Sequence, residues 1–173
     1  LQTLSLQIED GTVLILGEIA ESSASASQVR AVANALREIG KVKLCRIPQG
    51  ANAIGLAQVA VLPKSNGKNA LQMLDGSINT FVLFGIEPQF DFAATTLATK
   101  ALLTSKVIAC SAFVTEQLKE LADVILPIGL TPEIQASLVN VNGVEQSTEV
   151  AGKLPGAAQS GWRVLRALYD QCA

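Results

Sequence analysis

Short apolar runs alternate with amphipathic stretches along most of this chain. Residues 12–16 form an apolar, β-branched run ending at Gly17, which is typical of a buried strand followed by a turn. The hydroxyl-rich segment 21–25 suits the start of a helix, and Gly40 suits its end. Between them, helical spacing places on one face Val29, Val32, Ala33, Leu36 and Ile39. A second strand is predicted over residues 41–47.

The second half of the chain repeats this alternation. Apolar runs predict strands over residues 80–84, 106–110 and 123–126. The segments between them predict helices over residues 92–104 and 115–122. Strands that alternate with helices favour a parallel sheet with helices on both faces. The predicted fold class is therefore α/β, with a doubly wound and mostly parallel sheet.

The remaining segments are less regular. Residues 49–67 predict a loop, a short helix and another loop, and residues 69–74 predict a further short helix. Asn142-Gly143 favours a hairpin within residues 138–146. Residues 150–159 are rich in Gly, Pro and Ala and predict a loop before a last helix. The apolar face of that helix is Trp162, Leu165, Leu168 and Tyr169.

These elements predict a single α/β domain over residues 1–173. Its core would span residues 11–130, followed by a hairpin and loop over 131–159 and a C-terminal helix over 160–171. The chain opens on leucine and its only methionine is Met73. We therefore expect it to be a fragment of a longer chain.

Composition narrows the function classes. The chain is 49% hydrophobic but only 4% aromatic, which indicates a large aliphatic core. Its net charge is −2 and no basic face is apparent, so nucleic-acid binding is not expected. The longest apolar runs, such as residues 13–16, are far shorter than the roughly 20 residues of a membrane-spanning helix, so no direct membrane insertion is expected.

Catalytic and metal-binding residue types are sparse. The absence of histidine excludes triads that need an imidazole and removes the commonest metal ligand. The three cysteines, Cys45, Cys110 and Cys172, are far apart and form no C-x-x-C motif. We interpret Cys45 and Cys110 as small hydrophobic residues of the core and predict no catalytic and no metal-binding residue.

Gly17 stands where a doubly wound fold places its phosphate-binding turn. The sequence from Gly17 to Ser22 lacks the second and third glycines of G-x-G-x-x-G, and the carboxylates of Glu18 and Glu21 would repel a pyrophosphate. No G-x-x-x-x-G-K-[ST] motif occurs either. We interpret Gly17 as a turn residue.

One cluster of carboxylates and one separate glutamate are candidates for a catalytic or binding role. Glu116, Glu120 and Asp123 lie close together in sequence with Lys119 among them, and we interpret them as a solvated helix face. Glu133 follows a predicted strand, at the end where α/β folds gather functional residues. We expect a structural, hydrogen-bonding role for it.

The segment from Phe113 to Pro127, with Leu-Ala-Asp-Val-Ile-Leu-Pro at its end, closely resembles the F-x-T-E-T-A-x-x-A-D-V-V-L-P segment of the molybdopterin oxidoreductase superfamily. In that family, a Glu and a G-T-x-x-N-x-E-G-R-x-Q stretch follow. The matching positions of this chain are Asp123, Pro127, Glu133, Asn140, Gly143 and Gln146.

Three further segments share the resemblance. Gly85-Ile86-Glu87-Pro88 resembles the G-x-N/D-P turn of the family, with matches at Gly85 and Pro88. Asn52 and Gly55 match its A-N-x-x-G loop. Residues 161–168 resemble its D-W-K-I-L-R-A-L helix, which points to one branch, the large iron–sulfur (75 kDa) subunits of NADH–quinone oxidoreductases. The resemblance implies the Rossmann-like domain of the formate dehydrogenase and DMSO reductase type.

The departures from the family pattern concern the cofactor loops. Ala136 and Val144 replace a Gly and an Arg, and Glu87 replaces the Asn or Asp of the turn. In molybdenum enzymes these loops line the pterin site, where phosphates need Arg or Lys. Here Glu87, Glu133 and Glu145 would surround it with few cations. We therefore expect no cofactor in this segment and structural roles at the motif positions.

The resemblance implies a place in a respiratory complex. The whole complex would pass electrons from NADH through iron–sulfur clusters to quinone, with the clusters in another part of the parent chain. Its partners would be the other subunits of the complex. The domain would lie in the peripheral arm, on the cytoplasmic side of the bacterial inner membrane or the matrix side in mitochondria.

Two alternatives stay open. One is a cofactor-binding domain of a molybdopterin oxidoreductase such as a formate dehydrogenase, which would need cations and glycines in the loops after Gly17, Gly85 and Pro127. The other is a nucleotide-binding α/β module, for example the central domain of a thiamine-diphosphate enzyme.

Overall fold

The computed structural model describes residues 8–40, 42–92 and 94–172. They divide into two compact units. The first comprises the described residues up to Val61 together with Ser137–Gln146, and the second comprises Leu62–Ala136 and the residues from Ser147 onward. Each unit is described by itself, so a single domain over residues 1–173 stays a prediction.

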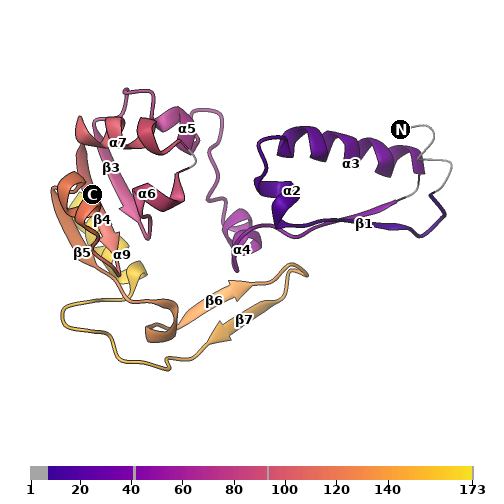
Figure 1. Cartoon of the computed structure of the whole chain (residues 1–173). Coiled ribbons are helices and arrows are strands. Elements are labelled where there is room, and N and C mark those ends of the chain that lie inside the picture. Colours follow the sequence, from indigo (N-terminus) through magenta and orange to yellow (C-terminus); the bar gives the residue numbers. More distant parts are fainter. Residues whose placement is uncertain (1–7, 41, 93, 173) are drawn as a thin grey trace. The chain divides into compact units, whose positions relative to one another are not determined.

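The first unit is built on a two-stranded parallel sheet (Figure 1). Its elements up to Val61 are β1 (Val13–Leu16), α2 (Glu18–Ser22), α3 (Ala26–Gly40), β2 (Lys43–Arg46) and α4 (Ala53–Gln58). The strands pair in register from Val13 opposite Lys43 to Leu16 opposite Arg46. Lys41, the predicted first residue of the second strand, lies outside the described residues.

Helix α3 covers one side of this sheet. Ala33 and Leu36, two members of its predicted apolar face, are buried, whereas Val32 and Ile39 stay exposed. The predicted helix is confirmed, but segment 21–25 does not simply cap it. Its first residues end the separate short helix α2, because Gly17 starts a helical turn immediately after β1.

The second unit contains a three-stranded parallel sheet in the order β3-β4-β5. Its strands are β3 (Thr80–Phe84), β4 (Lys106–Ser111) and β5 (Val124–Pro127). Its helices are α5 (Ala70–Met73), α6 (Pro88–Asp91), α7 (Thr95–Leu103), α8 (Glu116–Leu121), the 3-10 turn η1 (Thr131–Glu133) and α9 (Gly161–Cys172). Within the described part of the chain, β3 pairs with β4 alone and is an edge strand.

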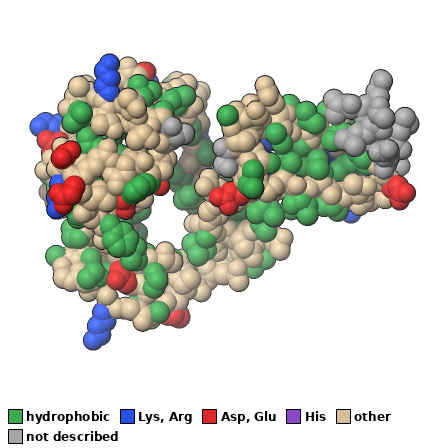
Figure 2. All heavy atoms as spheres, viewed as in Figure 1, with side chains coloured by type: hydrophobic (Ala, Val, Ile, Leu, Met, Phe, Trp, Pro, Cys, Tyr) green, Lys and Arg blue, Asp and Glu red, His purple; other side chains and the backbone are tan. Residues whose placement is uncertain are grey.

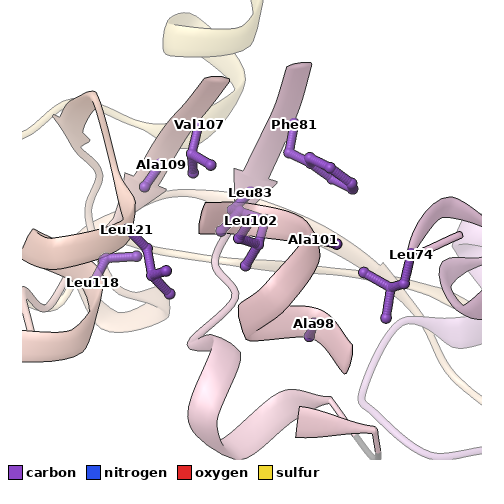
Figure 3. Close-up of a cluster of buried hydrophobic side chains, with 10 residues drawn as sticks. All are labelled: Leu74, Phe81, Leu83, Ala98, Ala101, Leu102, Val107, Ala109, Leu118 and Leu121. Atoms are coloured by element: carbon purple, nitrogen blue, oxygen red, sulfur yellow. The ribbon is translucent and has the colours of Figure 1, made fainter. Parts of the chain in front are cut away.

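One face of this sheet carries the core of the unit. Along β3, Phe81 and Leu83 are buried while their neighbours are exposed, because side chains of a strand alternate between faces. The buried face packs against α7 and α8 (Figure 3). The cluster consists of Leu74, Phe81, Leu83, Ala98, Ala101, Leu102, Val107, Ala109, Leu118 and Leu121.

Helix α9 packs on the opposite face. A Cβ atom on Gly161 would collide with the ring of Phe84, so the glycine permits a close approach to β3. Only Gly161 of this helix is buried. The predicted apolar face of this helix is largely exposed: Trp162, Leu165 and Tyr169 are 60%, 41% and 67% exposed. Figure 2 shows other hydrophobic side chains at the surface as well.

The helix predicted over residues 92–104 is also wrong in its bounds. The structure forms two helices, α6 and α7, separated at Phe92, which has an extended backbone. Pro88 explains the early start of α6, because its fixed φ and missing N–H suit the first turn of a helix. Ala93 of the predicted face lies outside the described residues.

The predicted hairpin forms between β6 (Ala136–Val139) and β7 (Glu145–Thr148). Parallel sheets and helices confirm the α/β fold class, although the five parallel strands form two sheets within the described residues. No helix of the described segments has the length and apolar character that a bilayer crossing requires.

Candidate functional site

A pocket of about 400 Å³ lies at the carboxyl ends of the three strands of the second unit. The loops after β3, β4 and β5 all contribute to it, which is the place where open α/β sheets bind ligands. Its described lining residues are Gly85, Glu87, Phe90, Asp91, Ser111, Ala112, Phe113, Ile128, Gly129, Leu130 and Thr131.

The pocket is acidic. Among its described lining residues only Glu87 and Asp91 carry a charge. The backbone N–H of Glu87, the residue before α6, donates to Oδ2 of Asp91, the last residue of α6, at 2.6 Å. Phosphates are bound by Arg, Lys and free N–H groups, so this donor set does not fit the phosphate-bearing pterin that the family resemblance implies.

Two motif positions shape the first loop of the pocket. Gly85 has a φ of +63°, a left-handed conformation that favours glycine, and its N–H donates to the Cys110 carbonyl at 2.8 Å. Pro88 is buried at the start of α6. Both residues direct the chain from β3 across the pocket, and Glu87 between them lines it.

Asp123 joins the starts of β4 and β5. Its Oδ2 accepts from the Val107 N–H at 2.8 Å, its own N–H donates to the Val107 carbonyl at 2.9 Å, and Oδ1 lies 3.1 Å from Nζ of Lys106. The bond from Val107 and the Lys106 ammonium lower the pKa of Asp123. Asp123 therefore lies at the amino ends of these strands, opposite the pocket.

Pro127 and Glu133 serve the loops after β5. The Pro127 carbonyl accepts from the Gln159 N–H at 3.2 Å, which ties the last loop to the end of β5. Oε2 of Glu133 accepts from the Leu130 N–H at 2.9 Å. The Glu133 carboxylate thus makes a hydrogen bond within its own turn.

Asn52 and Gly55 connect α4 to the hairpin of the first unit. Oδ1 of Asn52 accepts from the Val139 N–H at 2.8 Å. A Cβ atom on Gly55 would collide with that same carboxamide. The A-N-x-x-G spacing therefore places a hydrogen-bonding side chain beside the one residue type that leaves room for it.

Asn140, Gly143 and Gln146 shape the turn of the hairpin. Oδ1 of Asn140 accepts from the N–H groups of Asn142 and Val144 at 2.9 and 3.1 Å, and its Nδ2 donates to Oε1 of Gln146 at 3.3 Å. Gly143 has a φ of +79°. These three motif positions therefore belong to one hydrogen-bonded turn.

The motif positions thus fall into two groups, one in each unit, and only Gly85 lines the pocket. Of the three glutamates expected around a site, Glu87 lines it, Glu133 is engaged in its own turn, and Glu145 belongs to the first unit. That the motif positions hold no cofactor stays a prediction. The sequence alone did not identify Asp91 as a pocket residue. Its position on the first helical turn after β3 could have indicated it.

The region after β1 holds an ion-pair cluster that also escaped prediction. Glu21 receives both Nε and an Nη of Arg46 at 2.6 and 2.7 Å, and an Nη of Arg30 lies 3.1 Å away. The Glu21 side chain is only 9% exposed. The sequence predicts that Glu21 would repel a phosphate. In the structure its carboxylate pairs with two arginines of its own chain.

This cluster predicts a dependence of stability on pH. The hydrogen bonds from Arg46, reinforced by Arg30, lower the pKa of Glu21 from 4.5 to about 2. A lowered folded-state pKa stabilises the fold above pH 4.5, and this contribution disappears as the pH falls towards 2. We expect Glu21→Gln to lose stability at pH 7 and to show a smaller decline than the wild type between pH 4.5 and 2.

Circular dichroism during urea unfolding at several pH values would measure this. Glu116→Gln is the matched control, because Glu116 is 86% exposed and, among the described residues, its carboxylate pairs with Lys119 alone. Equal pH dependence of Glu21→Gln and the wild type would contradict the role of the cluster.

The other candidate residues have simple environments. Cys110 is buried, and burial raises the pKa of its thiol, which makes it unreactive. Cys45 is half-buried and Cys172 is exposed. No group of three or more His, Cys, Asp or Glu side chains that could hold a metal ion occurs among the described residues.

Comparisons with known proteins complete the picture. A stretch of 51 residues is 39% identical to the mitochondrial 78 kDa subunit of NADH–ubiquinone oxidoreductase from Neurospora crassa. It covers 30% of this chain and only 7% of that subunit. The family model of molybdopterin oxidoreductases matches residues 9–171. The chain therefore belongs to the molybdopterin oxidoreductase family.

Proposed function

We propose that this chain is part of the large iron–sulfur subunit of a proton-pumping NADH–quinone oxidoreductase, where it is a structural domain without a cofactor. The observation that carries the proposal is the pocket at the carboxyl edge of the β3-β4-β5 sheet. Its charged lining consists of two carboxylates, Glu87 and Asp91. An anionic pterin placed there would meet repulsion in a site of reduced dielectric constant.

The local match to the fungal 78 kDa subunit supports the choice of branch. On this proposal the iron–sulfur clusters belong to other parts of the parent chain. The domain packs against other subunits in the peripheral arm, on the cytoplasmic side in bacteria or the matrix side in mitochondria. Its exposed apolar residues, such as Trp162 and Tyr169, are surfaces for that packing.

Metal and pterin analysis tests the absence of the cofactor. We expect the purified parent protein to contain far less than one molybdenum or tungsten atom per chain and to release no fluorescent pterin after oxidation. A formate dehydrogenase prepared in the same medium is the positive control. A stoichiometric metal content would overturn the proposal in favour of a molybdenum enzyme, and micromolar binding of NAD, FAD or ADP would favour a nucleotide-binding module.

Co-purification tests the assembly. A tagged parent protein, extracted from membranes in mild detergent, should carry NADH–quinone reductase activity through affinity and size-exclusion steps. A tagged protein that elutes without this activity, from membranes that possess it, would contradict membership of the complex.

A further inference from the structure

The acidic pocket has a form that suits a cationic side chain. Its volume of about 400 Å³ is at the lower end of the range of roughly 300–1,000 Å³ for ligand sites. It is bounded by segments that follow all three strands of the sheet. A pocket of this size accommodates one long side chain or a small organic molecule.

The carboxylates of the pocket are available to a ligand. Glu87 is half-buried, and its backbone rather than its carboxylate bonds to Asp91. The side-chain ion pairs found among the described residues use neither of these two carboxylates. Two negative charges in a concave site without a counter-charge favour a cation.

Apolar surface accompanies these charges. Phe90 and Phe113 both line the pocket and are 75% and 57% exposed. Aromatic rings attract ammonium and guanidinium groups and also cover the methylene stems of Lys and Arg. The pocket therefore offers an apolar wall and a charged wall to the same occupant.

A metal ion fits this pocket poorly. Calcium requires about six to eight oxygen ligands, and magnesium about six in octahedral order. The described pocket residues supply two carboxylates, one of which already accepts a backbone N–H. Two exposed phenyl rings are also unsuited to a hydrated ion, so an organic cation is the better match.

We propose that this pocket binds the guanidinium or ammonium group of an Arg or Lys side chain from a neighbouring polypeptide. Glu87 and Asp91 pair with the charge, and Phe90 and Phe113 pack against the methylene stem. We call this proposed binding site the socket. The inference rests on the proposed absence of an anionic pterin from the same pocket.

A titration with n-butylguanidinium tests the socket. This probe has a guanidinium head and a short apolar stem, and n-butylurea is a neutral molecule of nearly the same shape. We expect saturable shifts of the Gly85, Phe113 and Gly129 amide resonances in the 173-residue chain, with a Kd of about 1 mM, and at least about fivefold weaker binding of the urea. Raising the salt concentration from about 0.05 to about 0.5 M should weaken binding.

Variants of Glu87 and Asp91 test whether the probe binds in this pocket. Glu87→Gln should weaken n-butylguanidinium binding about fivefold, and Glu87→Gln with Asp91→Asn about tenfold or more. Glu116→Gln, a change of the same kind on the surface of α8, should leave binding unchanged. If Glu87→Gln fails to fold, as judged by its amide spectrum, Asp91→Asn alone serves, because its amide oxygen still accepts the Glu87 N–H.

Absence of saturable shifts, equal binding of the guanidinium and the urea, or unchanged affinity in the carboxylate variants would overturn the socket. The metal analysis of the purified parent protein separates the two proposals. Stoichiometric molybdenum overturns both of them. Molybdenum-free protein that does not bind n-butylguanidinium overturns the socket alone.

Discussion

Leu102→Ala is expected to destabilise the second unit by about 2–5 kcal/mol, the largest effect of any substitution considered. Leu102 is only 1% exposed and lies between α7 and the sheet, in the cluster with Leu83 and Val107 (Figure 3). Removal of its isobutyl group leaves a cavity that the close-packed neighbours fill only in part. For a domain of ordinary stability, this loss is a large share of the total.

Leu103 provides a matched control on the same helix. It is adjacent in sequence but 64% exposed, so Leu103→Ala should change the free energy of unfolding by less than about 0.5 kcal/mol. Guanidinium unfolding, followed by the fluorescence of Trp162, reports on this unit because Trp162 is the only tryptophan. Similar midpoints for the two variants would contradict the location of the core.

The effect of Gly55→Ala on stability is expected to depend on the residue at position 52. It should be destabilising beside Asn52 and stabilising in the Asn52→Ala background. In the wild-type protein, the new methyl group collides with the Asn52 carboxamide and should cost about 1–3 kcal/mol. Asn52→Ala alone should cost about 1 kcal/mol, because the Val139 N–H loses its acceptor. In the Asn52→Ala background the collision is gone, and alanine within α4 should stabilise by up to about 1 kcal/mol.

Two measurements check this coupling. A double-mutant cycle from urea unfolding, followed by circular dichroism, gives the interaction energy of the two positions. Hydrogen exchange gives the local evidence, since the Val139 amide should exchange faster in either single variant. Additive effects of the two substitutions would contradict the contact between Asn52 and Gly55.

The strands of the second unit were predictable because each is a short apolar run, of strand length, between turn signals. Thr115 likewise marked the start of α8, where its hydroxyl accepts from the Leu118 N–H at 3.2 Å. The break at Phe92 was not predicted, since apolar spacing continues across residues 88–103 while the backbone turns. The apolar face of α9 was identified correctly, but spacing alone does not tell whether anything in the chain covers it.

The site was predictable in position but not in composition. The rule that ligands bind at the carboxyl ends of parallel strands points to the loops after β3, β4 and β5. It drew attention to Glu133 after the last strand, whereas Glu87 in the first loop was noticed only through the family resemblance. Phe90 lies in α6 and Phe113 in the loop after β4, and the two residues meet at one pocket only in three dimensions. The Glu21 cluster brings together side chains 9 and 25 residues apart, which no short motif records.

The free edge of β3 bears on how prone the protein is to aggregate in the cell. The strand reads Thr-Phe-Val-Leu-Phe, without charge or proline, and in the described residues its outer edge pairs with no other strand. Such edges template the addition of foreign strands and lead to aggregation. In copies whose β3 edge stays uncovered, we expect aggregation to compete with folding and proteolytic quality control to remove the excess.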